Sequence, residues 1–365
     1  MLPGDPAPPF TSPTPSTAAF SFLTVAGRYV LLAFLPLEAA AAEAALKAIV
    51  DHRRLFDDDK LCVFIVLRDR AAIPQARDEP PGLRWFLDAD GAVSRLYGML
   101  DADGTARPSW LLLDPTLRVL VNAPMSDTAT LMKILRALPP VDDHADTRLH
   151  APVLIVPRVF EPDFCKHLIS VYQANGGAPS GFMREVDGRT KLMRDPTHKR
   201  RSDVLIEDEP LRDAARARLL RRLAPEILKT FQFQPTRIER YIVSQYDSAE
   251  LGFFRPHRDN TTKGTAHRKF AVTINLNAED YDGGELRFPE YGSATYRAPT
   301  GGAVVFSCSL LHEATPVTRG VRYAFLPFLY DEAGAAVREA NLEYLDDEVA
   351  GALIGKRAGE PSPAG

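Results

Sequence analysis

The segment FFRPHRDN, residues 253–260, decides how the C-terminal half of this 365-residue chain is interpreted. It places His257 and Asp259 two residues apart near the end of an expected strand. Alternation along a strand aims both side chains to the same face of a sheet. An imidazole and a carboxylate on one face are two of the three ligands of a facial triad, which leaves coordination positions open on a non-haem Fe(II) ion. By itself the pattern also fits an exposed pair at a strand end, so a third ligand is needed.

His312 is the third candidate ligand. It comes at the end of the apolar segment AVVFSCSLLH, residues 303–312, which reads as a strand. Ten residues later, Arg322 lies in the segment VRYAFLPFLY, residues 321–330, where alternation places it on one face with apolar residues. A guanidinium that points into an apolar interior needs an anion. The bidentate carboxylate of a small bound acid would satisfy it.

The segments around these residues predict an antiparallel sandwich or barrel. A strand over residues 151–156 and a helix that starts near Pro162 come first, with the proline at an early helical position. Short strands separated by Gly, Asp and Pro then follow at residues 237–245, 269–277, 285–288, 302–311 and 321–329.

Residues 151–330 resemble the Fe(II)- and 2-oxoglutarate-dependent dioxygenases, particularly their prolyl 4-hydroxylase-like branch. The motifs that carry the resemblance fall in family order: SQYDSAELGFFRPH (244–257), His257-x-Asp259, NLN (275–277), YDGGEL (281–286), PTG (299–301), His312 and GVRY (320–323). The resemblance implies a double-stranded β-helix, or jelly roll, with flanking helices. It also implies that His257, Asp259 and His312 hold the iron and that Arg322 pairs with the C5 carboxylate of 2-oxoglutarate. Tyr246 resembles a tyrosine that contacts this co-substrate, and Asn275 matches the position of another polar contact to it.

The same resemblance implies a hydroxylase that inserts oxygen into an unactivated C–H bond and releases succinate and CO2, with ascorbate as reductant. A peptidyl residue such as proline is the favoured substrate. A small-molecule substrate and a non-catalytic binding protein are the alternatives, because one fold hosts many functions. The basic segment 184–201 reads as a mobile loop, either a cover for the substrate or a solvated surface.

The N-terminal half predicts a small α/β domain. Its expected strands cover residues 29–35, 61–67, 109–113 and 117–121, and its expected helices cover residues 37–50 and 129–138. Residues 4–138 resemble a peroxiredoxin-type thioredoxin fold through GDPAPPF (4–10), GRYVLL (27–32) and FLDADGAVSRLYG (86–98).

The N-terminal domain lacks the reactive cysteine of that family. The family's segment is Pro-x-x-x-Thr-x-x-Cys, whereas this chain, counted from Pro36, has Ala40 and Glu43 at the last two fixed places. Cys62 lies inside the apolar segment LCVFIVL, where a thiol behaves as a small buried hydrophobe. The domain is therefore expected to be redox-inactive, with a role in binding a protein partner or in self-association.

The expected organisation is a thioredoxin-like domain over residues 1–138, a linker over 139–150, a dioxygenase domain over 151–332, and a C-terminal helix with a disordered tail over 333–365. The prolines, mixed charges and absent apolar period of 139–150 indicate the linker.

Composition is that of a soluble globular protein, with 45% hydrophobic and 25% charged residues. The net charge of −4 and a pI near 6.1 give no general attraction to nucleic acid or to an anionic membrane. No signal segment or membrane span is expected, so a cytoplasmic protein is the prediction. Three widely separated cysteines predict no structural disulfide.

Overall fold

The structure is a computed structural model that describes residues 1–354. It divides into two compact units, one formed by Met1–Ala151 with Phe288–Ala294 and the other by Pro152–Arg287 with the residues from Thr295 onward. The segment 139–150 lies in the first unit and contains the 3-10 helix η5 (Val141–Asp143). The disordered tail expected at the end of 333–365 falls outside the described residues.

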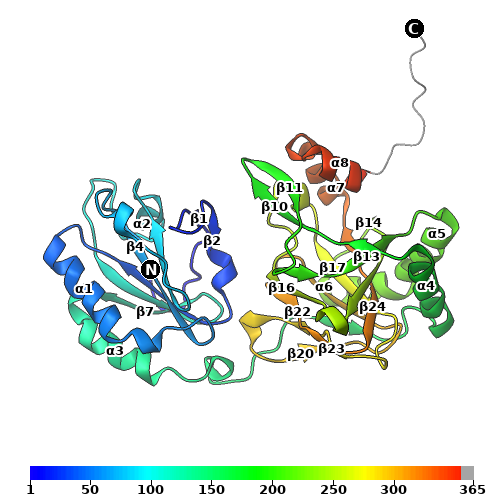
Figure 1. Ribbon diagram of the computed structural model, residues 1–365, viewed down its shortest axis with the longest axis horizontal. Helices are drawn as coiled ribbons and strands as arrows, with labels where there is room; N and C mark the ends of the chain where they lie inside the picture. Colours follow the sequence, from blue (N-terminus) through cyan, green and yellow to red (C-terminus); the bar gives the residue numbers. More distant parts are fainter. Residues whose placement is uncertain (355–365) are drawn as a thin grey trace, which may run out of the picture. The chain divides into compact units, whose positions relative to one another are not determined.

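The first unit is built on a five-stranded sheet in the order β5-β4-β3-β6-β7 (Figure 1). β3 runs parallel to β4, and β4 runs parallel to β5, whereas β6 and β7 are antiparallel to their neighbours. Its elements are β1 (Thr11–Ser12), β2 (Phe20–Ser21), η1 (Phe22–Val25), β3 (Tyr29–Phe34), α1 (Ala39–Asp51), η2 (Arg53–Leu55), β4 (Leu61–Leu67), η3 (Ile73–Gln75), β5 (Leu83–Leu87), α2 (Ala92–Leu96), β6 (Ser109–Leu113), β7 (Val119–Pro124), η4 (Met125–Asp127) and α3 (Thr128–Ala137). This is the thioredoxin-like α/β architecture that the sequence predicts.

Both faces of this sheet are covered by apolar side chains. Alternate β3 residues such as Leu31 pack with Ile49 of α1 and Leu135 of α3. On the other face, the Phe64 and Phe86 rings stack with centroids 4.5 Å apart. A strand that is buried on both sides reads as a continuous apolar run, which is why LCVFIVL was recognisable in the sequence.

The second unit contains two antiparallel sheets and two short strand pairs. The larger sheet has nine strands with the main path β14-β25-β17-β24-β15-β13-β9, from which β21 and β8 extend, and the smaller sheet has the order β12-β16-β22-β19-β20. The strands are β8 (Leu154–Val156), β9 (Ala178–Pro179), β10 (Phe182–Val186), β11 (Arg189–Met193), β12 (Lys199–Arg200), β13 (Ser202–Leu205), β14 (Arg237–Glu239), β15 (Ile242–Asp247), β16 (Phe253–His257), β17 (Phe270–Asn275), β18 (Asp282–Gly283), β19 (Leu286–Arg287), β20 (Thr295–Tyr296), β21 (Ala303–Ser307), β22 (His312–Ala314), β23 (Val317–Arg319), β24 (Val321–Phe325) and β25 (Phe328–Tyr330).

Helices cover the outer face of the larger sheet. α4 and α5 lie beside the sheet that contains β13 and β24 (Figure 1). Leu168 of α4 and Leu219 pack against Val243 and Phe325 in one buried cluster. The helical elements of this unit are α4 (Pro162–Asn175), α5 (Glu209–Arg218), the π-helix η6 (Leu219–Leu223), α6 (Ala224–Phe231), η7 (Ser248–Glu250), η8 (Lys263–Thr265), α7 (Glu332–Ala340), η10 (Leu342–Tyr344) and α8 (Asp347–Ile354). The 3-10 helix η9 (Pro289–Tyr291) belongs to the first unit. The interior between the two sheets contains polar side chains, which are described below, beside an apolar cluster that includes Phe254, Ala314 and Val317.

Three predicted strands are broken in the structure. Arg240 has φ +64, which separates β14 from β15. Pro327, which has no N–H to donate, lies between β24 and β25. The segment 302–311 ends as a strand at Ser307, and the chain crosses to the smaller sheet, so His312 begins a strand instead of ending one.

The basic segment 184–201 is not an irregular loop. Most of it forms the hairpin of β10 and β11 and the strand β12. The C-terminal helix expected within 333–365 is present as α7, which η10 and α8 follow. Among residues 1–354, no helix combines the length and apolar character that crossing a membrane requires.

Candidate metal and co-substrate site

The structure brings His257, Asp259 and His312 together. His257 at the end of β16 pairs directly with His312 at the start of β22, and their ring centroids are 4.3 Å apart. Asp259 follows two residues after β16, where its N–H donates to the carbonyl of Cys308 at 2.9 Å. One potential ligand atom from each of the three side chains lies within 4.8 Å of the others. The three donors therefore face one common point.

Hydrogen bonds to the backbone set the tautomer of both imidazoles. Nδ1 of His257 donates to the carbonyl of Arg255 at 2.7 Å, and Nδ1 of His312 donates to the carbonyl of Leu310 at 3.0 Å. Because a carbonyl can only accept, the unprotonated nitrogen of each neutral ring is Nε2. The two Nε2 atoms lie 3.6 Å and 3.4 Å from the carboxylate oxygens of Asp259. Metal-binding histidines in proteins are oriented in this way.

Burial and neighbouring side chains put His257 and Asp259 in the protonation states that a metal requires. Burial, reinforced by the neighbouring His312, lowers the pKa of His257 to about 4. Burial opposes ionisation of Asp259, but the His312 and His257 imidazoles outweigh it and lower the pKa of that carboxyl. At neutral pH the His257 ring is thus neutral and Asp259 is ionised. Two imidazole nitrogens and one carboxylate fit a divalent iron ion with open positions.

Arg322 lies on β24 directly opposite Tyr246 of β15. Its guanidinium carbon is 4.8 Å from the centroid of the Tyr246 ring. The side chain is buried, and its Nε and Nη1 have no acceptor among the described residues. A Cβ at Gly284, which has φ +65, would lie 3.0 Å from Cδ of Arg322. The glycine thus keeps space beside a buried cation that lacks an anion, which fits the C5 carboxylate of a keto acid.

Asn275 lies on the same face of the larger sheet as Arg322. It pairs with Ala324, which is two residues from Arg322 along β24. Its amide nitrogen donates to the carbonyl of Ala298 at 2.7 Å, and its Oδ1 has no donor among the described residues. Asn275 therefore holds the segment around Ala298 with one end and has a buried acceptor at the other.

Three polar residues near these groups were not singled out from the sequence. Tyr281 is buried with a hydroxyl that has no protein partner among residues 1–354, and its ring lies in the same apolar cluster as Tyr246. Lys199 and Arg201 lie on or beside β12 and are buried, although the sequence suggested a surface loop. Strand alternation gave no signal for this pair, because Lys199 belongs to β12 and Arg201 lies between β12 and β13, which belong to different sheets.

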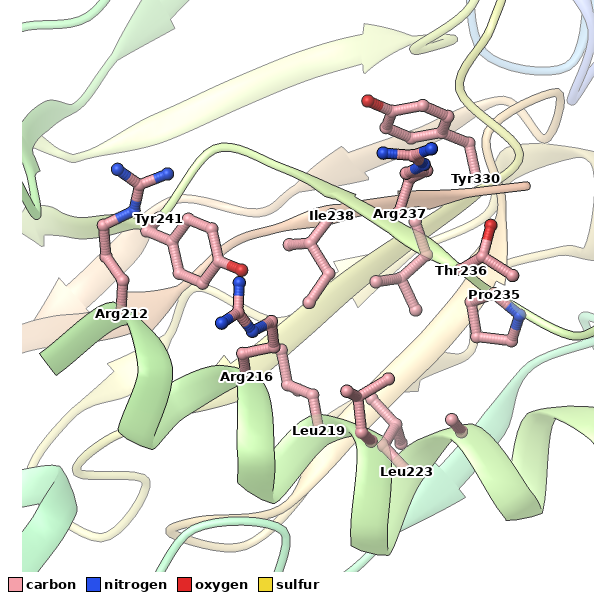
Figure 2. Close-up of a pocket in the computed structure, with 13 residues that line it drawn as sticks. Arg212, Arg216, Leu219, Leu223, Pro235, Thr236, Arg237, Ile238, Tyr241 and Tyr330 are labelled. Atoms are coloured by element: carbon pink, nitrogen blue, oxygen red, sulfur yellow. The ribbon is translucent and has the colours of Figure 1, made fainter. Parts of the chain in front are cut away.

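A separate cavity of about 280 Å³ lies between the helices that follow Asp208 and the strands β14 and β25 (Figure 2). Its floor includes Leu219, Leu223 and Ile238, and the Tyr241 hydroxyl points into it. None of the six predicted site residues lines it. Its arginines, Arg212, Arg216 and Arg237, pair with Glu209, Asp213 and Glu332.

Comparison with known proteins identifies both parts of the chain. Residues 241–330 match the model of the 2OG-Fe(II) oxygenase superfamily, and residues 3–121 match that of the AhpC/TSA family. Each part of the chain is thus similar to one of these two families, and the predicted combination of a thioredoxin-like fold with an oxygenase jelly-roll fold is confirmed.

Curated PKHD-type hydroxylases are similar to part of this chain. A PKHD-type hydroxylase of Bordetella pertussis is 32% identical over 145 residues, which cover 38% of this chain and 63% of that protein. A PKHD-type hydroxylase of Synechococcus is 32% identical over 112 residues, which cover 29% of this chain and 49% of that protein. The chain therefore spans less than two thirds of the length of these curated relatives.

Solved structures of prolyl hydroxylases are also similar to this chain. The prolyl hydroxylase of Trichoplax adhaerens, in complex with a hypoxia inducible factor peptide fragment, aligns with 17% identity and a TM-score of 0.38, over 57% of this chain and 96% of that one. A prolyl-4-hydroxylase of Pseudomonas putida aligns with 20% identity and a TM-score of 0.36, over 54% of this chain and 100% of that one.

Proposed function

We propose that the chain is an Fe(II)- and 2-oxoglutarate-dependent hydroxylase in which His257, Asp259 and His312 hold the iron. The observation that carries the proposal is the convergence of these three side chains, with both Nε2 atoms directed at one carboxylate. Arg322 would bind the C5 carboxylate of 2-oxoglutarate, with Tyr246 beneath its guanidinium. Asn275 and Tyr281 would offer further polar contacts to the bound acid.

The residues of this chain position the reactants and exclude water. When bound, Fe(II) with 2-oxoglutarate would supply oxidation by dioxygen: one oxygen atom enters succinate as the keto acid loses CO2, and the other enters a substrate C–H bond as a hydroxyl group. The Phe254 ring stacks on His257 with centroids 3.5 Å apart, and the Phe306 ring packs edge-on against His312 at 4.5 Å. These rings hold both imidazoles in place and keep their surroundings apolar, which restricts water at the metal.

A peptidyl residue such as proline is the substrate that the similarity to prolyl hydroxylases favours, and a small molecule is the second candidate. The N-terminal domain would contribute binding to a protein partner or to a second copy of the chain. Its Cys62 is buried, and burial raises the pKa of that thiol to about 12, which does not suit a peroxidase nucleophile.

Anaerobic titration of the metal-free protein with Fe(II) and 2-oxoglutarate tests the proposal before a substrate is known. We expect a visible metal-to-ligand charge-transfer band in the wild-type protein and none in His257→Ala or Asp259→Ala. Arg237→Gln, which removes an exposed ion pair with Glu332 at the separate cavity, is the matched control and should keep the band. A wild-type protein that binds Fe(II) and 2-oxoglutarate without this band, or an unchanged band in either ligand variant, would refute the assignment.

A further inference from the structure

A row of charged side chains lines the interior face of the second unit beside the candidate site. Asp203 of β13 pairs with Ser244 of β15, and Ser244 donates to its carboxylate at 2.6 Å. Arg201 precedes Asp203 by two residues, and Nη1 of Arg201 lies 3.5 Å from the Tyr246 hydroxyl. Ser180 connects these groups, because its hydroxyl accepts from Nζ of Lys199 at 2.7 Å and from Nη2 of Arg201 at 3.1 Å and donates to the carboxylate of Asp203 at 2.5 Å.

Lys199 is a buried cation close to the metal ligands. It pairs with Phe254 of β16, and its Nζ lies 4.7 Å from the centroid of the Phe254 ring, which stacks on His257. Its ammonium donates to the hydroxyl of Ser180 at 2.7 Å and to the carbonyl of Gly181 at 2.6 Å, and neither partner is a carboxylate. Burial lowers the pKa of Lys199 well below its ordinary value. A bound anion would favour the charged ammonium and raise the pKa of Lys199 again.

Arg201 and Arg240 have unused donors. Arg201 is 5% exposed and donates to Asp203 at 2.7 Å, but its Nε has no acceptor among residues 1–354. The Arg240 guanidinium lies 4.3 Å from the centroid of the Phe328 ring, and its buried Nε also has no acceptor there. Burial and the neighbouring Arg268 lower the pKa of Arg240 to about 10, and Arg201 and Asp203 are close enough to influence it.

The charges of this interior do not balance. The positive side chains are Lys199, Arg201, Arg240, Arg268 and Arg322, and the carboxylates are Asp203, Glu239 and Asp259. A divalent iron and a doubly negative keto acid cancel one another, so bound cofactors leave this excess unchanged. At the separate cavity of Figure 2, in contrast, each arginine has its own carboxylate. Buried positive charge in excess of the neighbouring carboxylates is costly, so this excess beside one site calls for an anionic ligand.

We propose that the substrate carries a carboxylate and that Lys199, Arg201 and Arg240 receive it. The inference rests on the proposed hydroxylase function and narrows its substrate to acidic peptides or carboxylate-bearing small molecules. The guanidinium forks would fix the carboxylate by paired hydrogen bonds, and the Lys199 ammonium would add a point charge. Holding the charged end of the substrate in this way would position the C–H bond near the iron.

Matched probes test the charge requirement on the full-length protein loaded with Fe(II) and 2-oxoglutarate. One arm compares a degenerate peptide mixture containing Asp and Glu with a mixture containing Asn and Gln at the same positions. The other arm compares free amino acids with their amides. The readout is succinate formed per minute, and we expect the carboxylate member of at least one arm to exceed its neutral partner by about tenfold or more. The arm that responds identifies whether the carboxylate belongs to a peptide or to a small molecule.

Variants connect the preference to the named residues. Arg201→Gln and Arg240→Gln should each reduce the carboxylate preference by about tenfold. In both variants, the 2-oxoglutarate concentration at the midpoint of the charge-transfer titration should stay within about twofold of the wild-type value. Arg237→Gln should change neither this midpoint nor the carboxylate preference. A missing charge-transfer band in the wild type would refute the proposed function itself. Two results would overturn this inference. One is a normal charge-transfer band with no preference for the carboxylate member in either arm. The other is a variant whose affinity for 2-oxoglutarate falls as much as its preference for the carboxylate member.

Discussion

Arg268 and Glu239 form a buried, bidentate ion pair directly behind the segment that carries Asp259. Nη2 of Arg268 lies 2.6 Å from one carboxylate oxygen of Glu239, and its Nε lies 2.9 Å from the other. The remaining Nη1 donates to the backbone carbonyl of Asp259 at 3.3 Å, and His267 contacts the same Glu239 at 2.8 Å. The pair therefore connects the end of β14 to the backbone beside a candidate metal ligand.

Replacing Arg268 should destabilise the fold strongly. Arg268→Gln would leave Glu239 buried without its cation, and we expect a loss of about 3 kcal/mol or more in the free energy of unfolding. Urea denaturation followed by circular dichroism measures it. The control is Arg319→Gln, which breaks a pair with Asp282 that is largely exposed on both sides and should cost under about 1 kcal/mol. Equal losses in the free energy of unfolding of the two variants would contradict the claim that the burial of the Arg268–Glu239 pair makes its loss costly.

Arg322→Gln should weaken 2-oxoglutarate binding and spare the metal. The substitution keeps a polar side chain but removes the charge and the paired donors that would bind the C5 carboxylate. We expect the affinity for 2-oxoglutarate to fall by about 30-fold or more, which corresponds to the lower end of the cost of a buried charged contact. Fe(II) affinity, measured separately by anaerobic equilibrium dialysis, should stay within about twofold. A variant that lost iron while keeping 2-oxoglutarate would contradict the assigned role.

The fold was predictable wherever a fully buried element appears in the sequence as a continuous run of apolar residues. The strand of residues 61–67 was found with its observed bounds because every residue in it is buried. The helices between Glu209 and Phe231 were not predicted, because α5 buries only Leu211 and Ala215 of its residues and is otherwise strongly charged. An N-terminal signal was nevertheless present, since Asp208 accepts from the N–H of Leu211 as a helix cap.

For the candidate site, only the residues that belong to recognisable motifs were predictable from the sequence. His257 and His312 are 55 positions apart in sequence, and only the cross-strand pairing of β16 with β22 makes them neighbours. The spacing suggested their roles but could not show the backbone carbonyls that orient both rings. The burial of Lys199 and Arg201 could not be predicted from the sequence, because a basic segment with Pro196 resembles a solvated loop. The strands beside them, β15 and β16, lie far along the chain.

All three cysteines should be unreactive in the folded chain. Cys62, Cys165 and Cys308 are buried and free, and burial raises the pKa of each thiol, to about 12 for Cys62 and about 11 for Cys165. We therefore expect an aromatic disulfide reagent to titrate no thiol near pH 8 in the native protein and three after denaturation. Rapid reaction of Cys62 in the native state would contradict the redox-silent interpretation of the N-terminal domain.

A carboxylate at the start of α4 should make stability depend on pH. Glu161 is the residue before that helix, and its oxygens accept from Nε of Arg218 at 2.7 Å and from Nη2 of Arg222. Hydrogen bonds from these two arginines lower the pKa of Glu161 to about 2 from its ordinary value of 4.5. A carboxyl with a depressed pKa in the folded state stabilises the fold above its unfolded-state pKa, and this contribution is lost as the pH falls toward the folded-state value.

Glu161→Gln should therefore cost more stability at pH 7 than in acid. Because the side chain is 43% exposed, we expect a cost of only about 1 kcal/mol at pH 7, shrinking measurably by about pH 3.5. Urea denaturation of wild type and variant at the two pH values gives both differences. The control is Asp163→Asn, in the first turn of the same helix, whose ion pair with Lys166 is largely exposed; it should give a smaller difference at pH 7 than Glu161→Gln. A Glu161→Gln penalty that stayed constant, or grew, on acidification would show that packing of the side chain, and not its charge, holds α4 against the helix that follows Asp208.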